Sequence, residues 1–277
     1  MNKNYFALLP SISVVVYSDI VSNKLLVQRY MINHEDLHCA LQILELRTKV
    51  LDLNLNQIEQ GYYGQIKELR ALDHKLCTLY KSITKYDFVS TIKGGSTLLV
   101  GEGNLSFTIS LVKKLQLLPN FITSTYEDYS ELSQHAWSNA KLLKQAGIKV
   151  LHELDATELH KYFYSNTFDT VIFQFPHSGS GESVNGINAN YVLVKKFIIS
   201  ASYVLKKDGV LLITVVDSDF YNNTFRFDEL AEELGISQPT KYKFNPKDYP
   251  EYEHTMTHQE ENGIDDYSKF ITYEFRI

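Results

Sequence analysis

The stretch that decides the fold is STLLVGEGNLSFTISLVKKL, residues 96–115. Its apolar run at 97–100 predicts a short buried strand, and the segment 105–115 predicts a helix. Between them lies the glycine-rich turn 101–103. A strand, a Gly-rich turn and a helix in this order are typical of nucleotide-binding α/β folds, where glycine lets a ligand approach the backbone. The turn lacks the third glycine of a dinucleotide fingerprint, so a cofactor with a pyrophosphate is not indicated.

From residue 93 onward, strand and helix patterns alternate, which is typical of a doubly wound α/β fold. The apolar runs LLV, VIF and VLLITVV suit strands that are buried on both faces of a parallel sheet. We therefore predict a mostly parallel Rossmann-like sheet. The predicted strands are 97–100, 121–125, 149–152, 170–175, 210–216 and two near 240–244 and 270–276, and the predicted helices are 105–115, 129–146, 157–164, 189–205 and 226–234.

The first 92 residues have a different pattern and predict a separate extension before a catalytic domain at 93–277. Two β-branched or apolar runs, 11–17 and 23–30, predict a β-hairpin. Helical spacing of apolar residues follows over 34–50 and about 54–86, which predicts an αα-hairpin. We expect this helical pair to serve as a scaffold or as the interface of a homodimer.

Composition limits the class of protein. The chain has 277 residues, of which 44% are hydrophobic and 22% charged, the balance of a globular protein. No stretch approaches 18 uncharged apolar residues and no secretory signal begins the chain, so we expect a cytoplasmic protein without a membrane segment. Cys39 and Cys77 have no metal-type spacing and are expected to stay reduced. The net charge of −6 gives no sign of a general basic face for nucleic acid.

Polar residues also follow the next three predicted strands. Glu127 could bind ribose hydroxyls, and Asp155 could accept a hydrogen bond from an adenine amino group or simply cap a helix. QFPHSGSG, residues 174–181, follows the fourth strand, where the reacting group is expected. Because the carboxyl ends of parallel strands meet at one edge of a sheet, we expect these loops to lie together. An adenosine ligand without a pyrophosphate fits this arrangement, and S-adenosylmethionine (SAM) is the leading candidate.

The chain also resembles a known family, through the motifs LLVGEGNLSF, TSTYED, LDAT, FDTVIFQFPHSG, Asn190 and FNPKDYPEYEHTMT. Together these resemble the domain of the large-subunit ribosomal RNA (uridine-N3)-methyltransferases, the BMT-five-like family, over roughly residues 96–258. The resemblance implies a class I SAM-dependent methyltransferase fold and a transferase activity, with methyl transfer favoured. By motif position it implies the following contacts: the methionine end of SAM with Gly101, Glu102, Gly103 and Asn104, the ribose with Glu127, the adenine with Asp155, and the acceptor with Phe175, Pro176 and His177.

Some motifs depart from the family pattern, and most of the departures concern the acceptor. Gln174 stands where family members often have Asn, and we predict that it contacts the cofactor. The strand at 210–216 runs into the acidic turn Asp217-Ser218-Asp219 instead of a Lys-containing one. Glu251 and Met256 replace a Gly and an Arg. Basic groups that could contact RNA phosphates are thus replaced, so the acceptor stays open between an RNA base and a small molecule.

A uracil acceptor would need a base to remove its ring N–H proton. His177 is one candidate, although it could equally fix the turn by a hydrogen bond, and Asp217 is a second candidate. Phe175 could stack on a planar acceptor or pack in the core. His254 and His258 have a spacing that suits a metal on a helix, but the Thr-Met-Thr between them favours extended structure, and no metal is predicted. Three residues of the same segment could form a lid or a pocket for a cationic substrate: Tyr249, Tyr252 and Glu253.

Three functions are therefore possible from the sequence. The first is methylation of a nucleic-acid base. The second is a SAM-using small-molecule enzyme that transfers or cyclises the aminocarboxypropyl arm, as nicotianamine synthase-like enzymes do, and releases methylthioadenosine. The third is a SAM-sensing or partner-binding protein without activity. The first requires cations around the mouth of the pocket, for example Lys195, Lys241, Lys243 or Lys247, whereas an acidic mouth would favour the second.

Overall fold

The computed structural model describes residues 85–93, 95–115, 120–179, 183–184, 186–254, 267 and 269–277. The predicted β-hairpin, most of the predicted αα-hairpin with its proposed dimer interface, both cysteines and His258 lie outside the described residues. Within the described part of the chain, no helix is long and apolar enough to span a bilayer.

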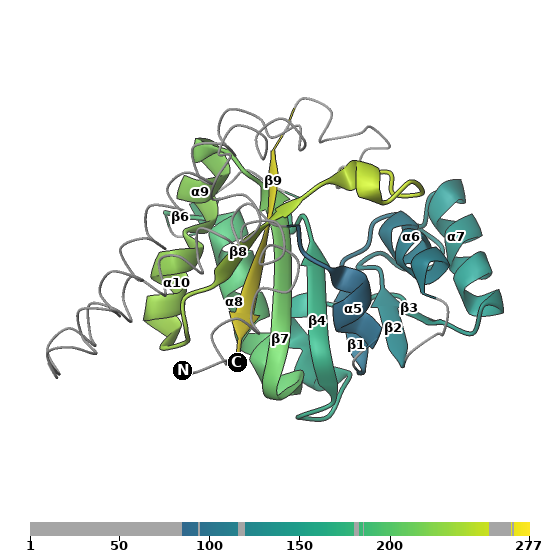
Figure 1. Cartoon of the computed structure of the whole chain (residues 1–277), viewed down its shortest axis with the longest axis horizontal. Helices are drawn as coiled ribbons and strands as arrows, with labels where there is room; N and C mark the ends of the chain where they lie inside the picture. The colour runs from purple at the N-terminus through teal and green to yellow at the C-terminus, as the bar shows by residue number, and fades with distance from the viewer. Residues whose placement is uncertain are drawn as a thin grey trace, which may run out of the picture. The chain divides into compact units, whose positions relative to one another are not determined.

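A seven-stranded sheet forms the centre of the described part (Figure 1). Its strand order is β3-β2-β1-β4-β7-β9-β8. Neighbours from β3 to β7 pair in parallel, and β9 pairs antiparallel with both β7 and β8. The predicted doubly wound, mostly parallel sheet is therefore confirmed. The strands are β1 (Thr97–Val100), β2 (Phe121–Ser124), β3 (Lys149–Leu151), β4 (Phe168–Gln174), β7 (Leu205–Val216), β8 (Thr240–Phe244) and β9 (Phe270–Arg276).

The strand order reverses between β1 and β4. The chain runs from β1 to β2 and β3 on one side, and then places β4 on the other side of β1. In an open α/β sheet, ligands bind beyond the carboxyl ends of the strands at such a switch point. The register pairs Val100 with Phe173, so the turns after β1 and β4 leave the sheet side by side.

Helices cover both faces of the sheet (Figure 1). Successive strand residues point to opposite faces, and accordingly Leu98 and Val100 belong to one apolar cluster while Leu99 belongs to the other. The helices on the face of Leu99 are α5 (Phe88–Lys93), α6 (Ser106–Lys114) and α7 (Gln134–Gln145). Those on the opposite face are the 3-10 helix η2 (Ala156–Lys161), α8 (Ala189–Val204), α9 (Asp219–Phe225) and α10 (Phe227–Leu234).

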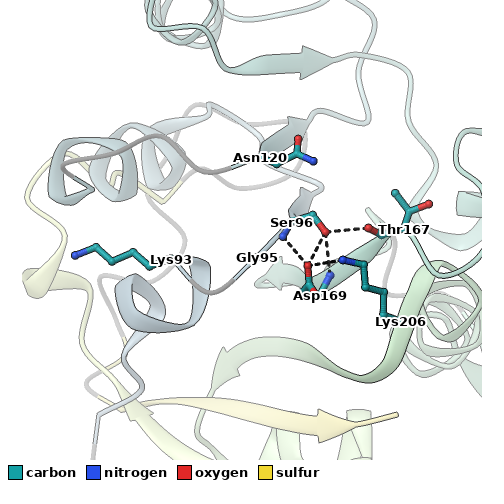
Figure 2. A pocket seen from close by; sticks show the side chains of 7 residues that line it. All are labelled: Lys93, Gly95, Ser96, Asn120, Thr167, Asp169 and Lys206. Carbon is teal, nitrogen blue, oxygen red and sulfur yellow. Dashed lines mark hydrogen bonds and ion pairs between the residues drawn. The ribbon is translucent and has the colours of Figure 1, made fainter.

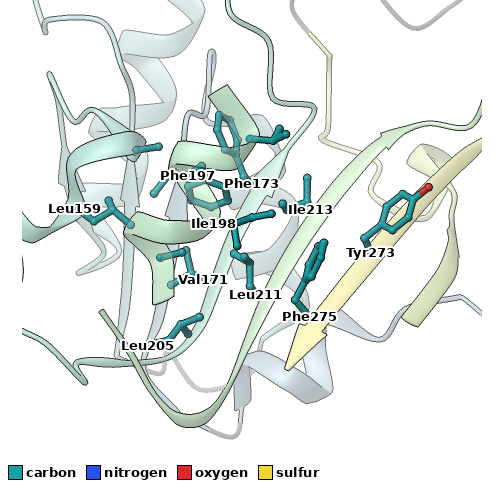
Figure 3. Packing of buried hydrophobic residues seen from close by; sticks show 14 of the residues in the cluster. Leu159, Val171, Phe173, Phe197, Ile198, Leu205, Leu211, Ile213, Tyr273 and Phe275 are labelled. Carbon is teal, nitrogen blue, oxygen red and sulfur yellow. The ribbon is translucent and has the colours of Figure 1, made fainter. Parts of the chain in front are cut away.

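The larger cluster packs α8 against the middle of the sheet (Figure 3). Phe197 of α8 meets the ring of Phe173 of β4 edge-on, with ring centroids 5.0 Å apart. Full burial of one such side chain stabilises the fold by roughly 2 to 3 kcal/mol. The apolar runs that predicted buried strands supply this layer, namely Val171, Phe173, Leu211, Ile213 and Phe275.

Several elements differ from the sequence prediction for local reasons. The predicted helix 157–164 is the shorter η2, in which Glu158 leaves helical geometry. β7 starts at Leu205, five residues before the predicted strand. Helix α9 was not predicted; it begins after Ser218, whose hydroxyl accepts a hydrogen bond from Tyr221 N–H at 3.4 Å. Three short elements were not predicted either: β5 (Ser183–Val184), β6 (Ile187–Asn188) and the 3-10 helix η3 (Pro246–Asp248).

The start of the described part joins this unit closely. Lys85 forms a parallel bridge with Lys243, so the end of the predicted helix 54–86 is not helical. Phe88 and Ile92 of α5 are buried in the same apolar cluster as Leu99. The chain divides by its internal contacts at Thr84, and the domain boundary between residues 92 and 93 stays a prediction.

Candidate functional site

The turn after β1 requires glycine for a reason that the sequence does not show. Gly101 has φ +66°, and a Cβ built there would lie 2.4 Å from the Phe173 ring. Any side chain at this position would therefore strain the backbone and collide with β4. The absent Cβ thus makes room for the protein's own ring, whereas the sequence analysis expected it to make room for a ligand.

Glu102 uses its carboxylate to complete the start of α6. Its Oε2 accepts a hydrogen bond from Thr108 N–H at 3.0 Å, and the helix has no side-chain cap at Leu105. The side chain is buried, and this burial raises the pKa of Glu102 to about 7, although the hydrogen bonds from Thr108 act in the opposite direction. The structure therefore places Glu102 under the turn as a helix-supporting group.

Asn104 is also fully engaged with the protein. Its Oδ1 accepts from Ser106 N–H at 3.0 Å, and its Nδ2 donates to the Glu253 carbonyl at 2.7 Å. Its own carbonyl accepts from Asn139 Nδ2 at 2.9 Å. Of the four predicted contacts to the methionine end of SAM, only Gly103 is exposed, so the surface that this turn offers a ligand is mainly backbone.

Residues 249–254, which we call the C-terminal strap, lie across α6. Ser106 Oγ donates to the Glu253 carbonyl at 3.0 Å and accepts from Glu253 N–H at 2.9 Å. Ser110 Oγ donates to Glu251 Oε2 at 2.7 Å, and Tyr249 is buried against the aromatic core of this face. The strap is therefore docked by its backbone and by the Glu251 carboxylate, and Tyr249 packs in the core with Lys114 Nζ 4.6 Å from the centre of its ring, while the predicted lid or pocket for a cationic substrate stays a prediction.

The loops after β2 and β3 lie side by side. Leu154 N–H donates to the Thr125 carbonyl at 3.2 Å, and Glu153 N–H donates to the Glu127 carbonyl at the same distance. The Glu127 carboxylate has no hydrogen bond or ion pair with the described residues. Asp155 Oδ1 accepts from Thr157 N–H at 2.8 Å, so the helix-capping role of Asp155 is confirmed, and its predicted contact with adenine stays a prediction.

The end of β4 carries a buried polar side chain that has no partner among the described residues. Gln174 is 8% exposed, and neither Oε1 nor Nε2 of its amide has a hydrogen bond to any described residue. Burying an amide without a partner is unfavourable by roughly 1 to 3 kcal/mol. The next residue, Phe175, has φ +51°, which is strained for a bulky side chain. Unpaired polar atoms and backbone strain are typical of ligand sites, and here they are adjacent.

The Phe175 ring packs in an aromatic cluster. It lies 4.8 Å from the His254 ring and 5.7 Å from the Phe270 ring, both in edge contacts, and it is parallel to Tyr252 at 6.3 Å. The core-packing interpretation of Phe175 is therefore confirmed for this ring, and stacking on an acceptor stays a prediction.

The two predicted bases lie at the ends of β4 and β7. His177 is exposed, and its Nδ1 accepts from Gly179 N–H at 3.0 Å, which fixes the turn as the alternative prediction expected. Asp217 follows β7 and accepts from Asn222 Nδ2 at 3.4 Å. Their roles in proton removal stay predictions.

A Tyr–His pair in the strap is the feature that the sequence analysis missed. Tyr252 Oη lies 2.9 Å from His254 Nδ1. Burial raises the pKa of Tyr252 and, together with the nearby charge of His177, lowers the pKa of His254 to about 4. Tyr252 therefore keeps its proton and His254 is neutral, and the Tyr252 hydroxyl can donate a hydrogen bond to Nδ1 in the tautomer that carries the ring proton on Nε2. From the sequence, His254 stands out only together with His258, as a possible metal ligand, and the described residues contain no cluster of three His, Cys, Asp or Glu that could hold a metal.

A groove of about 480 Å³ lies at the opposite edge of the sheet (Figure 2). Its central polar groups are bonded to one another, since Asp169 accepts from Ser96 N–H at 2.7 Å and from Lys206 Nζ at 2.8 Å. A Cβ at Gly95 would lie 2.3 Å from the same carboxylate. These contacts tie β4 to the start of β1, so the groove is explained by structure alone.

The edge at the carboxyl ends of the strands has groups that fit SAM. The unpaired Glu127 carboxylate can accept from ribose hydroxyls, and the Gln174 amide offers both a donor and an acceptor. The methionine end of SAM carries an ammonium and a carboxylate, which need such groups. The unpaired Gln174 amide beside the switch point therefore indicates that a polar ligand binds at this edge.

Comparison with known proteins agrees with this arrangement. The family model BMT5-like, described as rRNA (uridine-N3-)-methyltransferase BTM5-like, matches residues 98–256. The uncharacterized protein At4g26485 of Arabidopsis thaliana is 30% identical over 173 residues, which cover 56% of this chain and 78% of that protein. Heavy metal-associated isoprenylated plant protein 41 of the same plant is 33% identical over 164 residues. These residues cover 56% of this chain but only 32% of that protein. A SAM-dependent methyltransferase from Aquifex aeolicus aligns with a TM-score of 0.41 at 15% identity, over 66% of this chain and 82% of that one.

The family match covers more than half of the chain and includes the turn after β1, the end of β4 and the strap. Membership in this family also favours methyl transfer over transfer of the aminocarboxypropyl arm. The protein therefore belongs to the BMT5-like family of rRNA (uridine-N3-)-methyltransferases and is a SAM-dependent methyltransferase.

Proposed function

We propose that this methyltransferase acts on the ring nitrogen of a uracil base in RNA. The observation that carries this choice is the Tyr252–His254 pair beside the turn after β4. Loss of the imide proton from uracil leaves negative charge on the carbonyl oxygens beside the nitrogen. A neutral imidazole whose Nε2–H is free to donate is suited to bind one of those oxygens. The family description supports the same acceptor.

SAM, when bound, supplies a methyl group on a sulfonium. Different residues of the chain bind different parts of the cofactor. The turn formed by Gly101, Glu102, Gly103 and Asn104 and the Gln174 amide hold the methionine end. Glu127 accepts from the ribose hydroxyls, and the free Oδ2 of Asp155 accepts from the adenine amino group. Methyl transfer is an in-line displacement, so the main task of these groups is to align donor and acceptor.

Proton removal falls to Asp217 in this proposal. His177 Nδ1 already accepts from Gly179 N–H, so a neutral His177 carries its proton on Nε2 and has no free lone pair there. Asp217 has one carboxylate oxygen without a hydrogen bond among the described residues. His254 then stabilises the developing charge, an effect typically worth 100- to 1,000-fold in rate.

Two of the four lysines that were expected at the mouth of the pocket are paired with carboxylates. Lys195 pairs with Glu233, and Lys241 pairs with Asp228 at 2.7 Å. These two lysines are therefore less suited to RNA phosphates, and another basic surface is favoured. The cytoplasmic location and a homodimer through the helical extension belong to this proposal too, supported only by the cysteine spacing and by the apolar pattern of residues 34–86.

The test is product analysis with defined acceptors. The full chain and SAM are incubated with ribosomal RNA, with unstructured uridine-containing RNA and with free uridine. We expect S-adenosylhomocysteine to form with RNA, and 3-methyluridine to appear when that RNA is digested to nucleosides. Methylthioadenosine as the product, or turnover with a small amine and none with RNA, would overturn the proposal.

Two variants test whether His254 takes part in the reaction. His254→Ala should lower kcat about 100-fold, because the charge on the carbonyl oxygen loses its donor, while SAM affinity measured by calorimetry stays the same. His254→Gln, which keeps an N–H donor, should recover part of the rate. Equal losses in both variants would mean that His254 acts only in packing against Phe175.

A further inference from the structure

We infer that one exposed face of α7 holds the RNA strand that flanks the target base. This surface, called here the α7 platform, consists of Trp137, Lys141 and Lys144 of α7 together with Tyr129 from the loop before the helix and His152 from the loop after β3. The inference rests on the proposed RNA acceptor and names a surface for the strand other than Lys195 and Lys241, which are paired with carboxylates.

The α7 platform combines exposed aromatic rings with cations. Trp137 and Tyr129 are 42% and 43% exposed, which leaves part of each ring accessible. Lys141 Nζ lies 5.4 Å from the centre of the Trp137 ring, and Lys144 Nζ lies 4.9 Å from the centre of the Tyr129 ring. Positions 137, 141 and 144 share one face of a helix, so the rings and the cations form a continuous row.

Single-stranded nucleic acid is bound by this combination of groups. Bases stack on exposed aromatic rings whatever their identity, and lysines beside the rings follow the phosphates. In this structure the lysines can turn from the ring faces towards phosphates, since neither Lys141 nor Lys144 has a salt bridge to a described carboxylate. Such a platform suits a strand without secondary structure better than a duplex.

Charge in the surroundings restricts the path of the strand. Helix α7 contains no acidic residue. Asp128 and Glu131 lie in the preceding loop, and Asp128 is held there by Ser130 N–H at 2.8 Å. The His152 ring, 5.2 Å from the Tyr129 ring, has its pKa lowered by burial and by Lys144, so it adds a flat surface without charge. A phosphate chain is therefore favoured along Lys141 and Lys144 and away from the carboxylates of Asp128 and Glu131.

The position of the platform connects it with the site. Tyr129 follows Glu127, the predicted ribose contact, in the loop between β2 and α7. At the start of α7, His135 Nδ1 lies 3.4 Å from Glu253 of the strap, and Asn139 donates to the Asn104 carbonyl. His135 and Asn139 lie on the other face of α7, so an RNA strand on the platform would reach the site at its Tyr129 end, beside Glu127.

The chain provides its own probe, because Trp137 is its single tryptophan. Titration of the full chain with an unstructured uridine-containing oligoribonucleotide should quench or shift the Trp137 fluorescence, with the same Kd as anisotropy of a labelled RNA. Trp137→Ala should weaken binding of the labelled RNA about tenfold. The double variant Lys141→Gln/Lys144→Gln should also lower the slope of log K against log salt by about 1.4, because each lost phosphate contact removes about 0.7.

Matched controls lie on other surfaces. Tyr164→Ala removes a ring that is 89% exposed, and Lys207→Gln removes an exposed cation at the opposite edge of the sheet. Both should leave RNA binding unchanged, and all variants should bind SAM as the natural chain does. If RNA is bound and methylated equally well by the α7 variants, this inference is wrong and the proposed acceptor stands. If no RNA is bound while SAM is consumed with a small acceptor, the proposed function itself is wrong.

Discussion

The turns after β1 and β4 leave the sheet side by side, but their polar side chains differ in whether they have hydrogen-bond partners within the protein. After β1, the side chains of Glu102 and Asn104 have protein partners for their hydrogen bonds. After β4, both amide atoms of Gln174 lack a partner among the described residues, and Phe175 is strained. The glycine-rich motif is thus mainly a device of packing and helix capping, whereas the groups free for a ligand lie at the end of β4.

The largest effect that tests this contrast is on folding. Gly101→Ala should lower the free energy of unfolding by about 4 kcal/mol, because the new Cβ adopts a left-handed φ and collides with the Phe173 ring. Urea unfolding followed by circular dichroism measures it. Gly147→Ala is the control, since φ there is +81° with no atom within 4 Å of the added Cβ, and about 1 kcal/mol is expected. Equal losses in both variants would remove the packing role of Gly101.

The next prediction concerns the other turn. Gln174→Leu should lower SAM affinity and methylation about 100-fold, or about 2.7 kcal/mol, because the cofactor loses its amide partner. The same change should raise the free energy of unfolding by about 1 kcal/mol, since an unpaired buried amide is removed. Asn104→Leu should instead destabilise the fold by about 2 kcal/mol, because Ser106 N–H loses its acceptor and the Glu253 carbonyl loses one of its two donors.

Calorimetry with SAM and urea unfolding distinguish the two turns. A loss of stability in Gln174→Leu as large as that in Asn104→Leu would show that the Gln174 amide has a structural role. A stable Gln174→Leu protein with unchanged SAM affinity would show that the amide serves neither purpose.

The same contrast explains what could be read from the sequence. Apolar runs such as 210–216 predict strands well, because burial on both faces of a parallel sheet leaves a continuous pattern. The positions of Glu127 and Asp155 at strand ends were also predictable, since strand ends determine where loops meet. The roles of individual side chains could not be predicted. Gly101, for example, is required by the ring of Phe173, a residue 72 positions away in the sequence. His254 was missed as a site residue because its place depends on the docking of the strap to Ser106, which no local pattern reveals.

A smaller effect should appear in the pH dependence of stability. The pKa of Glu102 is raised in the folded protein to about 7, above its unfolded value, so folding takes up a proton between about pH 4.5 and 7. The contribution of the protonated Glu102 side chain to the free energy of unfolding is fully present below pH 4.5 and is lost as the pH rises through about 7. Glu102→Gln keeps an acceptor for Thr108 N–H without a charge, and should be more stable than the natural chain by about 2 kcal/mol at pH 8.

The difference between the two stability curves isolates Glu102. His254 acts in the opposite direction, because its lowered pKa makes stability rise with pH between about 4 and 6.5, but it is present in both proteins. Parallel curves from pH 4.5 to 8 would mean that Glu102 is ionised in the folded protein at no extra cost.

The smallest effect concerns Tyr252, which acts through His254 as a positioning residue. Tyr252→Phe removes the hydroxyl that donates to His254 Nδ1, so the neutral imidazole is free to carry its proton on either nitrogen. We expect kcat to fall about fivefold with SAM affinity unchanged, and the ¹⁵N NMR signals of the His254 ring to change from one tautomer to a mixture. Tyr249→Phe is the matched control, since the ring of Tyr249 packs in the same aromatic cluster and its hydroxyl has no hydrogen bond to any residue in the described ranges. Because packing of the Tyr252 ring against Phe175 survives in phenylalanine, a rate loss without the change in tautomer would trace the effect to the strap as a whole and not to the proton on Nε2.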